Sequence, residues 1–177
     1  MSNKNVLMVV ANEGFKDEEY FEPIDILRNN GIQVITAALQ VGKAKSALGQ
    51  TVIVDVAARY LLEDEDRWQK FDAIVFIGGQ GMEPLVDNEN FKQLAINFYQ
   101  AHKIIAAICV APLILAKAGI LRGKDATVFP SQEYIDELVN QGAEYIREDL
   151  VVSSNIITAS GPKAIYKFGL LLVNKLS

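Results

Sequence analysis

One cysteine stands where a predicted strand turns directly into a predicted helix. Cys109 follows the apolar segment 104–108 and precedes Val110-Ala111-Pro112, where Pro112 suits the first turn of a helix. A sharp strand-to-helix turn exposes its central side chain, as in the nucleophile elbow of hydrolases. Unpaired amides at a helix N-terminus also favour a thiolate over a thiol. The pattern predicts a nucleophile; the alternative is a small, inert side chain buried at the end of a core strand.

Four carboxylates follow the first apolar segment of the chain: Glu13, Asp17, Glu18 and Glu19. Such a run is typical of a solvated loop or of a helix N-terminus, where negative charge is stabilised. Glu19 is nearest the apolar face of the expected helix, so it is the best candidate to turn inward toward the sheet. Pro23 predicts a kink or an offset start in that helix.

A glycine pair and a single histidine complete the candidates. Gly78-Gly79 follows the apolar segment 73–77 and can offer backbone amides to an oxyanion, but it matches neither the dinucleotide fingerprint nor the phosphate-binding loop. His102 precedes segment 104–108 and therefore belongs to its amino end, whereas Cys109 belongs to the carboxyl end. We expect a surface histidine and no cysteine–histidine dyad. A lone cysteine supplies no multi-cysteine zinc site, and we expect no metal and no cofactor.

Apolar segments of strand length alternate with stretches of helical period, which predicts a three-layer α/β sandwich with a mainly parallel sheet and helices on both faces. We expect one domain over residues 1–177. Ligands gather at the carboxyl ends of parallel strands, so the loops 12–19 and 78–81 should meet Cys109 there. The expected strands are 6–11, 32–38, 51–56, 73–77, 104–108, 126–129, 143–146, 151–152 and 156–159. Helices are expected before the stop at 29–31 and at 90–101, 111–118, 133–140 and 166–173, with a weak helix and turn at 61–70 and a loop or hairpin at 40–50.

Composition narrows the class of protein. The chain has 177 residues, a formal net charge of −5 and a half-hydrophobic composition. The absence of a basic run argues against nucleic acid and against an anionic membrane surface as partners. The apolar stretch 6–11 is too short for a signal peptide or a membrane span, and one cysteine forms no internal disulfide. We therefore expect a cytoplasmic protein.

Four motifs in this order resemble the ThiJ/PfpI superfamily over nearly the whole chain: residues 19–28, Gly78-Gly79, residues 106–112 and residues 158–162. The resemblance implies a flavodoxin-like sandwich, often dimeric. It also implies that Cys109 is the nucleophile and that protonated Glu19 hydrogen-bonds its sulfur. The backbone amides of Gly79 and Val110 would then stabilise an oxyanion.

Two positions depart from that superfamily. Phe129 stands where many members carry histidine, and Val110 stands where PfpI-type proteases place histidine directly after the cysteine. Losing a general base typically lowers the rate ~10²–10⁴-fold, which argues against peptidase activity. Reactions that need only a reactive thiolate, such as attack on an aldehyde or oxidation to a sulfinate, remain compatible with these residues.

The residues support two hypotheses about function, and a third hypothesis assumes no catalytic activity. In the first, an enzyme of the glyoxalase/deglycase type, Cys109 attacks a small aldehyde such as methylglyoxal, Glu19 shuttles protons and Gly79 holds the oxygen. In the second, a redox-responsive and chaperone-like protein, an oxidant converts Cys109 to the sulfinate. The third is a scaffold that has lost the chemistry. We expect a small-molecule aldehyde or oxidant as ligand and a homodimer as assembly.

Overall fold

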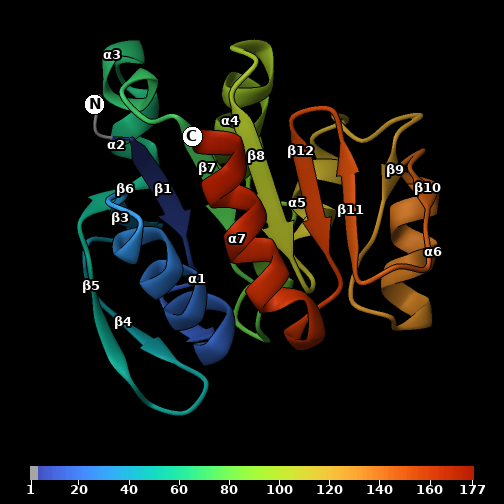
Figure 1. Ribbon diagram of the computed structural model, residues 1–177, viewed down its shortest axis with the longest axis horizontal. Helices are drawn as coiled ribbons and strands as arrows, with labels where there is room; N and C mark the ends of the chain where they lie inside the picture. The colour runs from blue at the N-terminus through green and yellow to red at the C-terminus, as the bar shows by residue number, and fades with distance from the viewer. Residues whose placement is uncertain (1–3) are drawn as a thin grey trace.

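The computed structural model describes residues 4–177 and centres on a seven-stranded sheet (Figure 1). The strands lie in the order β11-β12-β8-β7-β1-β3-β6, and every neighbouring pair is parallel except β11 with β12. Their bounds are β1 (Asn5–Val9), β3 (Gln33–Ala38), β6 (Val56–Ala57), β7 (Ala73–Phe76), β8 (Ile104–Ile108), β11 (Leu150–Ser153) and β12 (Ile156–Ala159). The predicted mainly parallel sheet is confirmed.

Helices cover both faces of this sheet, which makes three layers. On one face α1 (Asp17–Asn29) packs against α7 (Ile165–Leu176), in front of the strands in Figure 1. The other face carries α2 (Ala58–Leu62), α3 (Glu65–Gln69), α4 (Glu89–Gln100) and α5 (Pro112–Lys117), with α6 (Gln132–Asn140) against α5. Short 3-10 turns η1 (Glu83–Leu85) and η2 (Pro162–Ala164) precede α4 and α7.

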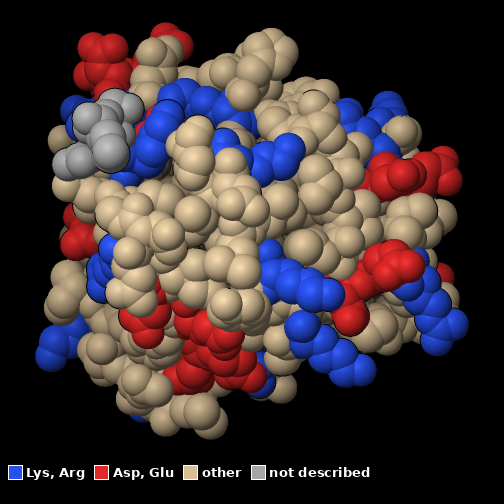
Figure 2. Space-filling model, viewed as in Figure 1, with Lys and Arg blue, Asp and Glu red and all other residues tan. Residues whose placement is uncertain are grey.

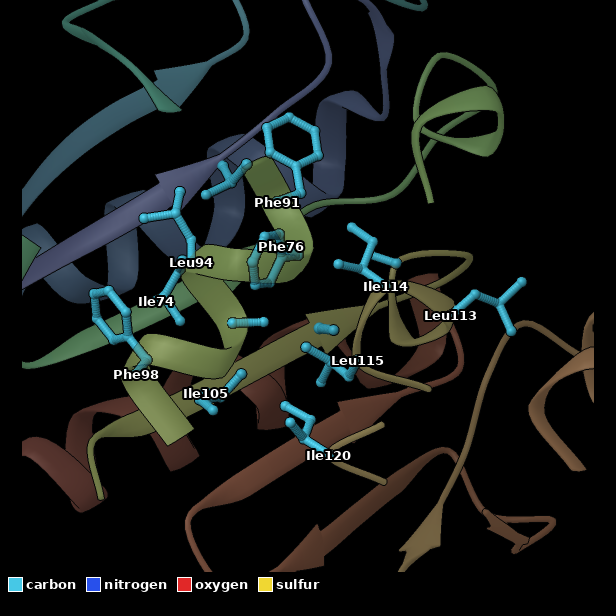
Figure 3. Packing of buried hydrophobic residues seen from close by; sticks show 14 of the residues in the cluster. Ile74, Phe76, Phe91, Leu94, Phe98, Ile105, Leu113, Ile114, Leu115 and Ile120 are labelled. Carbon is cyan, nitrogen blue, oxygen red and sulfur yellow. The ribbon is translucent and has the colours of Figure 1, made fainter. Parts of the chain in front are cut away.

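The apolar segments form buried strands because they supply side chains to both faces. In β1, Val6 and Met8 join the core under α1 and α7, whereas Leu7 and Val9 join the core under α4 and α5. This alternation follows from the two-residue period of a strand. Figure 3 shows the second core, in which Phe91, Leu94 and Phe98 of α4 pack onto Ile74 and Phe76 of β7, next to the side chains of α5.

Two smaller sheets stand beside the central one. The segment expected as a loop or hairpin is a hairpin of β4 (Gly42–Ser46) and β5 (Thr51–Val54), and β2 (Glu13–Phe15) pairs with β4. The strand expected at 51–56 is therefore divided between β5, in this small sheet, and the edge strand β6. A two-residue strand β9 (Asp125–Ala126) pairs with β10 (Glu144–Tyr145).

Two local expectations are wrong. Residues 127–129 are not a strand, because the amide of Thr127 donates to Thr158 Oγ1 at 2.9 Å and that of Phe129 donates to the carbonyl of Cys109 at 2.8 Å. These bonds turn the chain away from β9 and across the end of β8. The offset start expected from Pro23 is also wrong, because the helix starts at Asp17 and runs on to Asn29 with the proline inside it.

Across residues 4–177 no helix combines the length and the hydropathy that crossing a membrane requires. On the face shown in Figure 2, acidic side chains gather over the lower end of α1, and basic side chains lie mainly along the upper part of the view and right of its centre.

Candidate active site

Loops that leave the carboxyl ends of β1, β7 and β8 meet at one point. The amide of Lys16 donates to the carbonyl of Gly78 at 3.1 Å, and the amide of Gly81 donates to the carbonyl of Gly14 at 3.1 Å. These bonds join the loop after β1 to the loop after β7. The convergence predicted from topology is confirmed, and it places the first turn of α1 beside Gly78 and Cys109.

Cys109 occupies a strained turn between β8 and α5. Its φ is +64°, a left-handed conformation that residues other than glycine rarely adopt. The amide of Cys109 donates to the carbonyl of Ala159 at 2.9 Å, and its carbonyl accepts from Phe129. These two bonds hold the backbone in a conformation that costs on the order of 1–3 kcal/mol. The predicted elbow is confirmed, and its thiol is half-buried rather than enclosed in the core.

Glu19 is the carboxylate that turns inward. Its side chain is fully buried, whereas Glu13 is exposed. Oε2 accepts a hydrogen bond from the amide of Gly78 at 3.0 Å, and the carboxyl group also contacts the thiol of Cys109. Within residues 4–177, Oε1 has no hydrogen-bond partner of its own. The carboxyl group therefore has an oxygen free to take a proton.

Burial sets the charge of this carboxyl group. Removal from water raises the pKa of Glu19 to about 7, against the opposing effects of the Gly78 amide and the Cys109 thiol. Close to neutral pH the group therefore exists in both its protonated and its ionised form. A carboxyl group with such a pKa is suited to take up and release protons.

The thiol behaves differently from the expectation. Burial and the negative charge of Glu19 raise the pKa of Cys109 to about 12, although the amides of Gly79 and Val110 act in the opposite direction. Beside an ionised Glu19 the thiol therefore keeps its proton, whereas the predicted thiolate was expected beside a protonated Glu19. Helix α5 has only six residues and starts three positions after the sulfur, so its amides do not outweigh desolvation and a neighbouring carboxylate.

The backbone around the thiol leaves no room for larger residues. A Cβ atom at Gly78 would lie 2.6 Å from Cys109 Cβ, 2.8 Å from Glu19 Oε2 and 2.9 Å from the carbonyl oxygen of Ile108. Gly79 has φ +111°, and a Cβ there would lie 2.5 Å from the carbonyl oxygen of Gly14. Glycine at both positions lets the β7 loop approach the sulfur closely enough for the Gly79 amide to bond it.

A cavity of about 300 Å³ opens onto the thiol. Its wall contains Cys109, Glu19, Gly79 and Val110, which the sequence had indicated as site residues. Further side chains, both apolar and polar, complete the wall. These further lining residues are Lys16, Gln80, Glu83, Phe129, Tyr134 and Pro162. The cavity is large enough for a small molecule beside the sulfur.

The two positions that depart from the histidine pattern also face this cavity. Val110 and Phe129 both line it, and the Phe129 ring meets the Tyr134 ring nearly edge-on, with centroids 6.4 Å apart. His102 is exposed and precedes β8, at the opposite end of that strand from Cys109. The prediction that no cysteine–histidine dyad forms is confirmed.

Sequence reasoning missed Glu83 and Tyr134. Burial and the neighbouring Glu83 carboxylate raise the pKa of Tyr134 to about 12. Neither residue lies in a motif: Glu83 starts the turn η1 and Tyr134 lies in the first turn of α6. Only the folding of α6 beside the β7 loop brings them together. As for metals, the part of the chain from Lys4 onward contains no group of three or more His, Cys, Asp or Glu side chains placed to hold an ion.

Comparison with known proteins agrees with this geometry. Residues 4–175 match the DJ-1/PfpI family model. The chain belongs to the DJ-1/PfpI family. A crystal structure of a ThiJ/PfpI domain protein from Brachyspira murdochii superposes with a TM-score of 0.91 at 32% identity, covering 100% of both chains. The family's flavodoxin-like fold is thus the fold of this chain.

Two curated relatives cover most of the sequence. An uncharacterised protein of Methanocaldococcus jannaschii is 40% identical over 171 residues, which is 96% of this chain and 81% of the relative. A protein of Pyrococcus horikoshii named a deglycase is 33% identical over 161 residues, which is 91% of this chain and 92% of the relative.

Proposed function

We propose that this protein is a cysteine-dependent enzyme of the glyoxalase/deglycase type that acts on small reactive aldehydes such as methylglyoxal. The observation that carries the proposal is the contact between the Cys109 thiol and Glu19, a fully buried carboxyl group with a pKa of about 7. A nucleophile and a base that is active near neutral pH then share one cavity. The name of the Pyrococcus horikoshii relative supports the same class of activity.

The first step is addition of the thiol to the aldehyde. As the sulfur attacks the carbonyl carbon, a C–S bond forms and the thiol proton passes to ionised Glu19. The carbonyl oxygen becomes an alkoxide beside the amides of Gly79 and Val110, and Glu19 passes the thiol proton on to it, which completes a hemithioacetal and returns Glu19 to its ionised form. Base-assisted attack does not require a standing thiolate, so it is compatible with a thiol pKa of about 12.

For a 2-oxoaldehyde, the remaining steps are proton movements followed by hydrolysis. Glu19 removes the hydrogen from the carbon bonded to sulfur, giving an enediol, and a proton then returns to the neighbouring carbon. The product is a thioester of a 2-hydroxy acid. Water hydrolyses it, releasing the acid and restoring the thiol, so that one aldehyde and one water give one 2-hydroxy acid.

Two other activities fit this site less well. Oxidation to the sulfinate starts from the thiolate, which a raised thiol pKa makes scarce at neutral pH. Peptide hydrolysis needs a proton donor for the leaving amine, and the histidine positions carry Phe129 and Val110. Addition to an aldehyde needs only the Cys109 thiol, the Glu19 carboxyl group and the two backbone amides, all of which this site contains.

Replacement of Cys109 by alanine tests the proposal. We expect methylglyoxal consumption and 2-hydroxy acid formation to fall to background in Cys109→Ala, because no other cysteine exists in the chain. The matched control is His102→Ala, an exposed position at the amino end of β8, which should keep full activity. Unchanged turnover in Cys109→Ala would exclude the mechanism.

We also propose a ligand class and an assembly for this chain. The ligand would be a small aldehyde, and the chain would form a homodimer. Sedimentation equilibrium over a range of concentrations measures the assembly directly, and a mass equal to one chain at every concentration would rule the dimer out.

A further inference from the structure

A second cavity adjoins the cavity at Cys109. This second cavity, of about 220 Å³, shares three wall residues with the first: Glu83, Val110 and Tyr134. Val86 and Leu113 give the second cavity an apolar side, and Lys117, Glu133 and Glu137 line the rest. A ligand whose aldehyde reaches the sulfur therefore has Glu83 at the junction where its far end would extend.

Part of the charge around this junction is balanced by ion pairs, but within the described part of the chain the charges of Glu83 and Glu133 are not. Lys117 Nζ lies 2.6 Å from Glu137 Oε1, and Lys16 Nζ lies 3.5 Å from Glu18 Oε1. Over residues 4–177, Glu83 has no lysine or arginine nitrogen within 4.0 Å. The junction consequently keeps a net negative charge.

Tyr134 positions the charge of Glu83. Its hydroxyl interacts with the Glu83 carboxylate, and its ring packs on Phe129, the apolar wall of the cysteine cavity. Glu83 is exposed, and its interaction with Tyr134 favours positions of the carboxylate at the junction. Fixed charge at the mouth of a cleft changes the local concentration of charged ligands and the rate at which they arrive.

We propose that Glu83, positioned by Tyr134, is a charge filter for the Cys109 cavity that favours cationic aldehydes and repels anionic ones. The substrate part of this inference rests on the proposed function. The electrostatic part concerns access to the sulfur and holds for any reagent that attacks it. Glu83 is thus a specificity determinant, and Tyr134 is a positioning residue.

Thiol modification by a matched series of reagents measures the filter without any turnover. Methanethiosulfonates that carry a trimethylammonium group, no charge or a sulfonate group all transfer their thioalkyl group to the sulfur and release the same sulfinate. The readout is the ratio of the cationic to the anionic modification rate of Cys109. In Glu83→Gln we expect this ratio to fall about threefold to tenfold at low ionic strength, with the neutral rate unchanged.

Two further variants separate this effect from general ones. Glu65→Gln removes the same charge from α3, outside both cavities, and should leave the ratio as in the wild type. Tyr134→Phe keeps the ring and removes the hydroxyl, so the ratio should fall by less than in Glu83→Gln. The double variant should show no further fall. About 0.5 M salt should shrink the wild-type ratio.

The outcomes separate this inference from the proposed function. A ratio that Glu83→Gln leaves unchanged overturns the filter, and a ratio unaffected by Tyr134→Phe overturns the positioning role of that tyrosine. If wild-type protein leaves methylglyoxal untouched while the ratio still depends on Glu83, the proposed function fails and the filter stands. If methylglyoxal is consumed, Glu83→Gln should raise kcat/KM for an anionic 2-oxoaldehyde relative to that for methylglyoxal, and an unchanged ratio of the two would overturn the substrate part of the inference.

Discussion

The Oε2 atom of Glu19 lies 3.0 Å from the amide nitrogen of Gly78, and this bond orients the carboxyl group toward Cys109. The amide belongs to the loop after β7, whereas Glu19 belongs to the first turn of α1. One hydrogen bond therefore aligns two elements with the sulfur of a third. Because the donor is a backbone amide, no side-chain substitution removes it directly.

The pH dependence of activity should follow Glu19. Ionised Glu19 accepts the thiol proton, so kcat/KM for methylglyoxal should rise with pH through an apparent pKa near 7. Glu19→Gln should remove this limb and lower kcat/KM about 10²–10⁴-fold. Rate profiles from about pH 5 to pH 9, with His102→Ala as control, measure both effects. A wild-type limb retained in Glu19→Gln would assign it to another group.

The stability of the protein should show the opposite dependence. Burial raises the pKa of Glu19 from 4.5 to about 7, so the folded state binds the proton more tightly than the unfolded state does. The stabilisation by bound proton is present below about pH 4.5 and is lost as pH rises to 7, at a cost of about 3 kcal/mol. Glu19→Gln should therefore raise the free energy of unfolding at about pH 8 and change it little at about pH 4.5.

Urea unfolding of both forms at the two pH values measures this difference. Glu65→Gln, an exposed change on α3, should alter neither value by more than about 0.5 kcal/mol. An equal effect of Glu19→Gln at both pH values would mean that the carboxyl group does not titrate in this range.

Gly78 should tolerate no side chain. In Gly78→Ala the new Cβ meets Cys109, Glu19 and the backbone of Ile108 at less than 3.0 Å. We expect a loss of about 1–3 kcal/mol in stability and a loss of aldehyde turnover, because the contact between carboxyl group and thiol is forced apart.

Gly31→Ala provides the control for backbone strain. Gly31 has φ +74°, and nothing lies within 4 Å of a Cβ built there. This variant should lose about 1 kcal/mol of stability and keep full turnover. Similar losses of activity in both variants would show that general destabilisation, rather than crowding of the site, is responsible.

Histidine at position 129 should activate the thiol. Phe129 is 40% exposed and lines the cavity at Cys109, so Phe129→His places an imidazole on the same wall with access to water. An imidazolium there stabilises the thiolate and should lower the Cys109 pKa, raising the iodoacetamide labelling rate at about pH 6.5 about tenfold. Phe129→Leu, which opens the wall without adding charge, should change labelling less than twofold; equal acceleration in both would point to access alone.

The strand-to-helix elbow was predictable because its signals are local. Five apolar residues, one cysteine and an early proline determine β8, the turn and the start of α5, and the alternation of such segments determines the layered sheet. The inward turn of Glu19 was predictable for a similar reason, since it depends on which face of α1 is apolar. In contrast, the path of residues 127–129 depends on hydrogen bonds to Thr158 and Cys109, which no local pattern contains.

Only the tertiary structure decided the charge states and the shape of the pocket. The pKa of Cys109 depends on how much water the fold removes and on a carboxylate from a distant part of the chain, so the local tendency of a helix start toward thiolate was overridden. Glu83 and Tyr134 became neighbours only because α6 folds beside the loop after β7. Electrostatic interactions act through space, and the sequence specifies the identity of these groups but not the distances between them.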